Sequence, residues 1–314
     1  MIKLFTHTDL DGVGCGILAL LTLGRYTKID ISYCDYDNIN SEIQNYLKNE
    51  HDNTTPIFIT DISVNEETAE LLDKSGNVRL LDHHPTALWL NKYNWCSVVV
   101  EYENEQIGTI KTSGTEMFCH WLMEYDCLKG YDYVKDTRTL ERFAELVRDY
   151  DTWRWTDLGD DGVICKQIND LLYLYGRDEF IRWCISEIQD RIFPELSPID
   201  KAVLKIRQGE IDRYIEEKDK TMFIKPVCNK TCGVVFADRY FNELGNQLCK
   251  MHPEIDFVAM IDISDCSVSY RTIKEDIDLG KDIASIFGGG GHLKAAGSRF
   301  DQNVKADIVK NVFG

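Results

Sequence analysis

The sequence predicts an α/β protein with an N-terminal domain built on a doubly wound parallel sheet and a smaller C-terminal α/β domain. Strand-like and helix-like segments alternate through the first third of the chain, which favours parallel strands with helices on both faces. A long polar helical segment separates this region from a second α/β pattern. We therefore expect one domain at residues 1–190, a helical linker at residues 191–220 and a second domain at residues 221–314.

The strands of the N-terminal domain are predicted from short apolar runs that end in polar residues. They cover residues 2–7, 29–36, 56–61 and 78–81, with a fifth expected at residues 97–101. Helical periodicity joins them at about residues 13–23 and 38–49. Ser63 and Glu66 predict a capping box at the start of the helix that follows the third strand.

Helices dominate the rest of the N-terminal domain and the linker. They are expected at residues 113–125, 139–150 and 164–192. Ser197 as N-cap, with Pro198 at the first helical position, starts a long polar helix that reaches about Lys220. In the C-terminal domain we expect strands at residues 233–237, 256–261 and 267–272, and helices at residues 240–251 and 279–287.

Acidic and histidine side chains follow three of the predicted parallel strands. They are His7, Asp9 and Asp11 after the first strand, Asp61 at the end of the third, and Asp82, His83 and His84 at the end of the fourth. The carboxyl ends of parallel strands meet at one edge of a sheet, so these side chains are expected to converge. Aspartate and histidine together favour a divalent metal such as Mn²⁺ or Zn²⁺, with Mn²⁺ preferred as carboxylates accumulate. A helix cap or turn explains one of these acids but does not need the imidazoles.

Two more acids, Asp149 and Asp151, lie where the helix at residues 139–150 ends. Negative charge at that end of a helix is unfavourable against the helix dipole. A metal cation would compensate it, and plain solvation is the alternative. The nearby Trp153 and Trp155 are of a type that more often packs than stacks on bases.

Four consecutive glycines, Gly288 to Gly291, precede His292 in the C-terminal domain. We interpret this run as a nest of backbone amides for a phosphate or carboxylate, without a packing role, followed by the start of a helix. A flexible linker is the alternative. Arg271, near the end of a predicted strand, and His292 would add charge-assisted donors to the same anion.

Charge and cysteine usage restrict the partners and the compartment. The 314 residues carry a net charge of −18, which disfavours a long phosphate backbone but allows a short polyanion if metal ions supply local positive charge. The eleven cysteines are scattered without a Cys-x-x-Cys pair. No signal peptide or membrane-spanning stretch is evident, so we expect reduced thiols and a cytoplasmic protein.

These motifs together resemble the DHH family of phosphoesterases, with a C-terminal domain of the DHHA1 type. The N-terminal matches are His7-x-Asp9-x-Asp11-Gly12, Asp61, Asp82-His83-His84 and an aspartate after a helix, best matched by Asp149 with Asp151 as the rival. The C-terminal matches are Ser269-Tyr270-Arg271-Thr272 and the run from Gly288 to His292. Within the family the chain looks most like the branch of small nanoRNases, or oligoribonucleases.

The resemblance implies two divalent cations, usually Mn²⁺, with Mg²⁺ or Co²⁺ as alternatives. It places His7 and Asp9 on one ion and Asp11 and His83 on the other, with Asp61 as the bridge and Asp149 completing the set. Asp82 and His84 are the implied catalytic pair: Asp82 ligates and also orients a histidine, and His84 faces the scissile phosphate. A water activated by both ions would attack phosphorus in line.

The implied substrate site lies in the C-terminal domain, where a clamp on a terminal phosphate or base would favour short substrates. Its residues are Arg271, Gly288, Gly289, Gly290, Gly291 and His292. The implied activity is hydrolysis of short RNA or linear dinucleotides to mononucleotides. The alternatives are a cyclic-dinucleotide phosphodiesterase, a polyphosphatase or pyrophosphatase, a long-substrate exonuclease and an inactive binding module. RNA or DNA preference, the end attacked and homodimer formation stay open.

Overall fold

The computed structural model describes residues 1–314 except residues 53, 105–107, 125–136 and 191–192. The described residues divide into two compact units, Met1–Leu204 (unit 1) and Lys205–Gly314 (unit 2). The division falls inside helix α8 (Pro198–Asp219). Each unit has its own sheet and its own apolar core, so each is described by itself.

Unit 1 is built on a five-stranded parallel sheet with the strand order β2-β1-β3-β4-β5. Its strands are β1 (Ile2–His7), β2 (Ile29–Cys34), β3 (Ile57–Thr60), β4 (Val78–Asp82) and β5 (Cys96–Val98). The predicted parallel sheet is therefore confirmed. The fifth strand ends at Val98, so it is shorter than expected.

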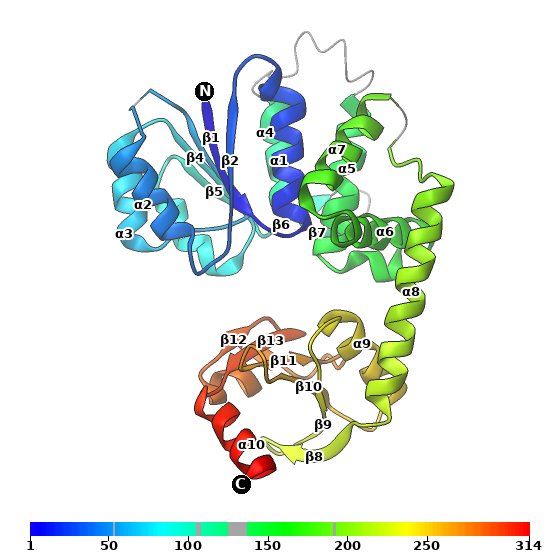
Figure 1. Cartoon of the computed structure of the whole chain (residues 1–314). Helices are drawn as coiled ribbons and strands as arrows, with labels where there is room; N and C mark the ends of the chain where they lie inside the picture. The colour runs from blue at the N-terminus through cyan, green and yellow to red at the C-terminus, as the bar shows by residue number, and fades with distance from the viewer. Residues whose placement is uncertain (53, 105–107, 125–136, 191–192) are drawn as a thin grey trace. The chain divides into compact units, whose positions relative to one another are not determined.

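Helices cover both faces of this sheet, which makes unit 1 doubly wound (Figure 1). Its helical segments are α1 (Leu10–Thr22), η1 (Leu23–Arg25), α2 (Ile39–Asn49), α3 (Glu66–Ser75), η2 (Pro85–Lys92), α4 (Gly114–Glu124), α5 (Thr137–Asp151), η3 (Arg154–Asp157), α6 (Asp160–Tyr175) and α7 (Arg177–Asp190). Strands β6 (Glu101–Asn104) and β7 (Gly108–Lys111) form a separate two-stranded sheet.

Successive residues of a strand pack into different cores of unit 1, because their side chains alternate between the two faces of the sheet. Phe5 and Ile59 pack into the core beneath α2 and α3. Their neighbours Leu4 and Phe58 pack into the core beneath α1, α4 and α5. The inner strands β1, β3 and β4 are thus largely buried on both faces, which leaves their ends for polar chemistry.

Two local predictions in unit 1 are wrong. Asn65, and not Ser63, caps α3: its side-chain oxygen accepts a hydrogen bond of 2.9 Å from the Thr68 amide. The helix expected at residues 164–192 divides into α6 and α7 at Gly176, whose left-handed φ of 73° ends α6. The last residues of that prediction, 191–192, and residue 125 of another predicted helix lie outside the described residues.

The start of α8 is capped as expected. Ser197 Oγ accepts from the Asp200 amide at 3.2 Å, and Asp200 Oδ2 accepts from the Ser197 amide at 2.7 Å. This is a reciprocal capping box with Pro198 at the first helical position.

Unit 2 is built on a six-stranded mixed sheet with the strand order β12-β13-β11-β10-β9-β8. Its elements are β8 (Phe223–Val227), β9 (Lys230–Phe236), α9 (Phe241–Met251), β10 (Phe257–Asp262), β11 (Ser267–Arg271), η4 (Leu279–Ile283), η5 (Ala284–Phe287), β12 (Gly290–Gly291), β13 (Ala295–Arg299) and α10 (Asn303–Phe313). One core lies between the sheet and the helices α8 and α9, and a second contains residues of η4 and η5.

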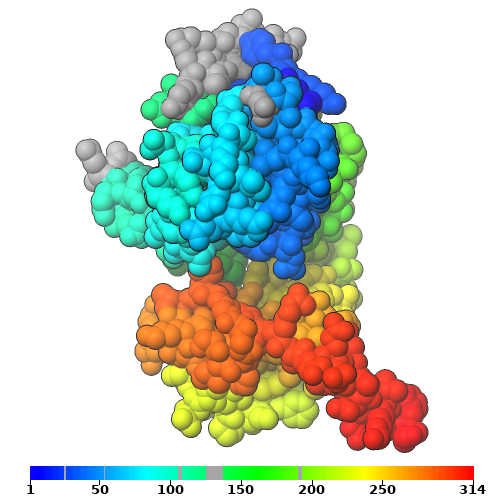
Figure 2. All heavy atoms as spheres, turned by 90° about the vertical axis from the view of Figure 1, so that its left-hand side faces the viewer, coloured from blue at the N-terminus to red at the C-terminus, as the bar shows by residue number. Residues whose placement is uncertain are grey.

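Helix α10 ends the chain and projects from the surface of unit 2, where Figure 2 shows it in red. All of its residues are exposed. In the described parts of both units, every helix falls short of the length and apolar character that a bilayer crossing requires.

Candidate metal centre and substrate site

The acids and histidines predicted in unit 1 meet at the carboxyl edge of the parallel sheet. Three groups of side chains hold ligand atoms within 4.8 Å of one another: His7, Asp9 and Asp61; Asp61, Asp82, His83 and His84; and Asp11, His83 and Asp151. Asp61 and His83 each belong to two groups. The eight residues therefore form one continuous assembly, which we call the metal cluster.

Asp9 serves both as a helix cap and as a member of the cluster. Its Oδ1 accepts a hydrogen bond of 3.1 Å from the Gly12 amide at the start of α1, and its Oδ2 lies 2.9 Å from His7 Nδ1. A Cβ at residue 12 would lie 2.2 Å from the His7 carbonyl oxygen, so only glycine lets α1 begin this close to β1. The helix cap is therefore present, and it leaves the second carboxylate oxygen of Asp9 beside His7.

Asp11 joins the cluster to the first turn of α4. Its buried carboxylate accepts hydrogen bonds from the Gly114 amide at 2.6 Å and the Thr115 amide at 2.8 Å. Its Oδ2 also lies 3.6 Å from His83 Nε2. The helix start fixes the carboxylate, because these amides have no partner within the helix.

Asp61 lies at the centre of the cluster in a strained backbone conformation. Its φ is 58°, and it is 1% exposed. Its Oδ1 lies 3.2 Å from His83 Nε2, and its Oδ2 lies 3.8 Å from His7 Nδ1. A left-handed conformation at a residue other than glycine costs free energy and is typical of functional sites.

Asp82 holds the ring of His84 by a hydrogen bond. Its Oδ1 accepts from His84 Nδ1 at 2.7 Å and from the His83 amide at 2.8 Å. The carboxylate is fully buried at the end of β4. A buried carboxylate that holds the imidazole in this way fixes the orientation of the ring.

The structure places the Asp149 and Asp151 carboxylates in different surroundings. Asp149 Oδ1 accepts hydrogen bonds from Arg148 Nε at 3.0 Å, Arg148 Nη2 at 2.9 Å and Arg154 Nη1 at 3.1 Å. Asp151 Oδ2, in contrast, lies 3.6 Å from His83 Nε2. Among the described residues, the carboxylate of α5 that belongs to the metal cluster is therefore that of Asp151, our rival candidate, and not Asp149, our first choice.

Burial and the crowding of acids shift the pKa values of the cluster. Burial, together with the Asp11 and Asp9 carboxylates, raises the pKa values of Asp61 and Asp151 well above the ordinary range. For His84, burial favours the neutral ring, but the Asp82 carboxylate outweighs it and raises the pKa to about 9. For Asp9, burial favours the neutral acid, but contacts with His7 and the Gly12 amide outweigh it and lower the pKa to about 2.

The donor set fits divalent cations. Asp61 Oδ2 and Asp82 Oδ2 are buried and have no hydrogen-bond partner among the described residues. Unpaired buried polar atoms are costly, and several buried carboxylates side by side repel one another. Bound cations with oxygen and imidazole ligands would satisfy these atoms and neutralise the charge.

In unit 2 the structure places Arg271 and His292 at the same end of the sheet. Arg271 pairs with Ala295 across β11 and β13, and the His292 amide donates to the Ala295 carbonyl at 2.7 Å. The Arg271 guanidinium donates to Asn242 Oδ1 through Nε at 3.0 Å and Nη2 at 2.6 Å. Burial lowers the pKa of Arg271 to about 10.

The glycine run does pack, contrary to our interpretation, and a strand follows it where we expected a helix. The amides of Gly288, Gly289 and His292 donate to carbonyls of the protein, and Gly290 and Gly291 form β12. A Cβ at residue 289 would lie 2.0 Å from the Gly297 carbonyl oxygen. The backbone thus uses these glycines to lie against β13, and two of the predicted nest amides, those of Gly288 and Gly289, are already bonded.

Because of this packing, substitution of neighbouring glycines should change the stability of unit 2 by different amounts. We expect Gly289→Ala to destabilise unit 2 by about 1–3 kcal/mol, because backbone atoms must move. Gly290 has open space around the Cβ position, so Gly290→Ala should change stability by less than about 0.5 kcal/mol. Thermal melts of the two variants test this difference, and equal losses would contradict it.

Two features near the metal cluster escaped the sequence analysis. The first is Tyr36, which follows β2 at the carboxyl edge and whose hydroxyl lies 3.1 Å from His84 Nε2. Its position after a strand was a usable signal, but we considered only acids and histidines. The second is the buried ion pair between Arg148 and Glu116, which connects α5 to α4. No sequence signal pairs residues this far apart.

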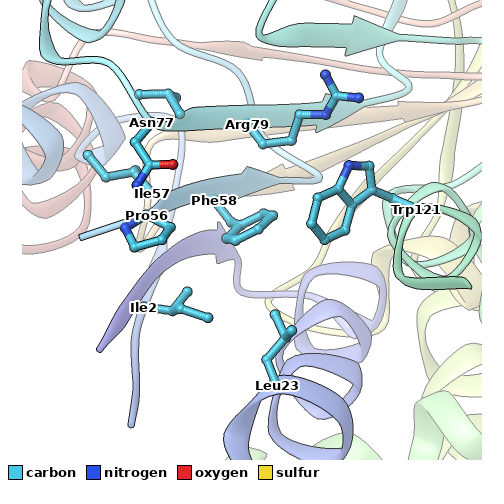
Figure 3. A pocket seen from close by; sticks show the side chains of 9 residues that line it. Ile2, Leu23, Pro56, Ile57, Phe58, Asn77, Arg79 and Trp121 are labelled. Carbon is cyan, nitrogen blue, oxygen red and sulfur yellow. The ribbon is translucent and has the colours of Figure 1, made fainter. Parts of the chain in front are cut away.

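A cavity of about 400 Å³ opens at the opposite edge of the sheet (Figure 3). Its lining includes Ile2, Ile57 and Val78, the first residues of β1, β3 and β4. Phe58, Arg79 and Trp121 also line it. It shares no residue with the metal cluster, so the cavity and the metal cluster lie at opposite ends of the strands.

Comparison with known proteins identifies the family. No family model matches the chain. The chain is 36% identical to oligoribonuclease NrnB of Bacillus subtilis (strain 168) over 321 residues, which cover 100% of this chain and 76% of that protein. The fold and the Asp82-His83-His84 motif define a DHH-family phosphoesterase. The chain belongs to this family and, within it, to the family of oligoribonuclease NrnB.

Solved structures agree on the fold. RecJ of Thermus thermophilus in complex with Mn²⁺ superposes with a TM-score of 0.56 at 14% identity, over 99% of this chain and 51% of that one. A second structure, of exonuclease RecJ bound to manganese, gives 0.54 at 13% identity, over 99% and 88%. CDC45 of Entamoeba histolytica gives 0.52 at 8% identity, over 99% and 94%. At these identities the likeness shows the fold alone.

Proposed function

We propose that this protein is a metal-dependent phosphodiesterase that hydrolyses short oligoribonucleotides to mononucleotides. The observation that carries the proposal is the metal cluster, in which buried carboxylates and imidazoles from separate strands converge with unpaired ligand atoms. The 36% identity to an oligoribonuclease over the whole chain supports the substrate class. The net charge of −18 agrees with a short substrate, since it opposes a long polyanion.

The proposed metal ligands follow the groups seen in unit 1. His7, Asp9 and Asp61 would hold one ion, and Asp11, His83 and Asp151 would hold the other. Asp61 would be shared, because its two oxygens face His7 and His83 separately. Mn²⁺ is the proposed metal, since mixed carboxylate and imidazole ligands suit it.

The bound ions would supply Lewis acidity and a deprotonated water as nucleophile for attack on phosphorus. The chain's own residues do the rest. Asp11 is held by the first turn of α4, and Asp82 holds His84 toward the open side of the cluster. We propose that His84 and Asp82 act on the phosphate, as the resemblance implied, and that no serine or cysteine nucleophile takes part.

We propose a division of labour between the two units. Unit 1 would carry the hydrolytic chemistry, α8 would act as the linker, and unit 2 would bind the far end of the substrate. Arg271 is the principal candidate there, because it lies at the same end of the sheet as His292 and carries a positive charge. His292 and the run from Gly288 to Gly291 stay predicted contacts, with the amides of Gly290 and Gly291 as part of β12.

The proposed compartment is the cytoplasm. The ten cysteines among the described residues are all free, and most are buried. Burial raises the pKa of several of them, for example that of Cys34 to about 11. Thiols in this state agree with a reducing environment. A homodimer stays a prediction.

A hydrolysis assay on one panel tests the proposed function. Purified full-length protein with Mn²⁺ is given RNA of two to twenty-four nucleotides, cyclic dinucleotides and pyrophosphate, with the same RNA in EDTA as the control. We expect rapid cleavage of two- to five-nucleotide RNA and slow cleavage of long RNA. Preference for cyclic dinucleotides or for pyrophosphate would overturn the proposed substrate, and inert behaviour toward the whole panel would overturn the enzyme assignment.

A further inference from the structure

Tyr36 lies beside two histidines of the metal cluster, His7 and His84. It follows β2 at the carboxyl edge of the sheet, and its ring centroid lies 5.1 Å from that of His7 and 6.0 Å from that of His84. The residue is 54% exposed, whereas the Asp82 behind it is fully buried. Tyr36 is therefore open to solvent, unlike the buried Asp82.

The loop that carries Tyr36 is held by neighbouring side chains. Asn38 Oδ1 accepts from the Asp35 amide at 2.9 Å, and Asp35 Oδ1 accepts from Thr8 Oγ1 at 2.8 Å. These contacts fix the backbone on either side of Tyr36 without using its phenol. The loop therefore does not depend on the hydroxyl for its conformation.

The hydroxyl is the end of a chain of hydrogen bonds that starts in the core. Asp82 Oδ1 accepts from His84 Nδ1 at 2.7 Å, and His84 Nε2 lies 3.1 Å from Tyr36 Oη. Both nitrogens of His84 are therefore engaged within the protein. A phenol can accept a hydrogen bond from an imidazole N–H and still donate its own proton to another acceptor, and donors linked in this way strengthen one another.

We propose that Tyr36, and not His84 directly, makes the contact with the substrate: its hydroxyl donates a hydrogen bond to an oxygen of the scissile phosphate, and Asp82 and His84 act through it. The proposal rests on the proposed phosphodiesterase function and specifies how one side of the phosphate is bound. Its partner is an anionic phosphate oxygen, the acceptor that a polarised phenol donates to most strongly.

Replacing the phenol with a phenyl ring tests the contact with substrate. Tyr36→Phe should lower kcat on dinucleotide RNA by about tenfold to a hundredfold, the effect of one charge-assisted hydrogen bond, with KM changed by less than about threefold. Tyr26→Phe is the matched control, since Tyr26 is 66% exposed and lies before β2, at the other end of that strand. A kcat within about twofold of wild type for Tyr36→Phe, at an unchanged melting temperature, overturns the proposal.

A double-mutant cycle shows whether His84 acts through Tyr36. In a His84→Ala background, Tyr36→Phe should lower kcat by less than about threefold, because the series of hydrogen bonds from Asp82 to Tyr36 is already interrupted. If instead the two reductions in kcat multiply, His84 and Tyr36 act independently, and the proposed series of hydrogen bonds is wrong. Melting temperatures of all four proteins exclude unfolding as the cause.

A measurement without turnover separates this inference from the proposed function. In the metal-free protein with ¹⁵N-labelled histidine, the His84 ring signals are assigned by their loss in His84→Ala. Tyr36→Phe should shift the Nε2 signal of His84 and leave the other histidines in place, whereas Tyr26→Phe should shift none. An unmoved His84 signal overturns the contact. If the shift occurs but wild-type protein cleaves no RNA, the contact stands and the proposed function fails.

Discussion

Replacing Asp151 with Asn should lower the rate of RNA hydrolysis by about 10³-fold and weaken Mn²⁺ binding, while the protein stays folded. Asp151 Oδ2 faces His83 within the metal cluster, so the change removes one negatively charged ligand and keeps the shape of the side chain. Losing a ligand to a catalytic ion removes several kcal/mol of transition-state stabilisation. Steady-state kinetics and calorimetric titration with Mn²⁺ measure the two effects.

Asp149→Asn is the matched control, because it makes the same chemical change two residues away. Asp149 is paired with Arg148 and Arg154, so we expect a loss of about 1–3 kcal/mol of stability. Below the melting temperature, Mn²⁺ affinity should stay within about tenfold of wild type. If Asp149→Asn abolishes Mn²⁺ binding and Asp151→Asn does not, the assignment of the ligand is wrong.

Asp61→Asn should have opposite effects with and without metal. In EDTA the variant should melt at a higher temperature than wild type, because Asp61 is buried beside the Asp9, Asp11 and Asp151 carboxylates that raise its pKa. Asparagine also tolerates the left-handed φ of 58° at this position. In Mn²⁺ the order should reverse, because the shared ligand is lost.

The size of the reversal follows from linkage. Mn²⁺ at a hundred times its dissociation constant should stabilise wild type by about 2.7 kcal/mol, or about 5–10 °C in a unit of this size. Asp61→Asn should show little of this gain. Thermal melts in EDTA and in Mn²⁺, for both proteins, give the comparison. A variant that is destabilised in EDTA, or that gains as much from Mn²⁺ as wild type, contradicts the role of Asp61.

The sheet and the cluster of unit 1 could be predicted because both depend on local patterns. Apolar runs mark the strands, and parallel strands bring their carboxyl ends to one edge, so His7, Asp61 and Asp82 had to converge. The choice between Asp149 and Asp151 could not be made in the same way. It depends on the exact end of α5 and on Arg148 and Arg154, which hold one acid and leave the other to the cluster.

The errors in unit 2 have a different physical origin. A glycine run allows an anion nest and also a close backbone approach, and sequence alone does not show that β13 lies against Gly289. The same ambiguity explains the strand at Ala295 where a helix was expected, because alanine and glycine carry little β preference. The role of Tyr36 depends on a contact with His84 across two strands.

The wide spacing of the cluster along the chain has a consequence during synthesis. Its residues run from His7 on β1 to Asp151 at the end of α5, and α1, α4 and the strand ends must all be in place to bring them together. The domain folds as a unit as the chain emerges, N-terminal part first. A ribosome must therefore deliver about half of the 314 residues before the metal cluster can form.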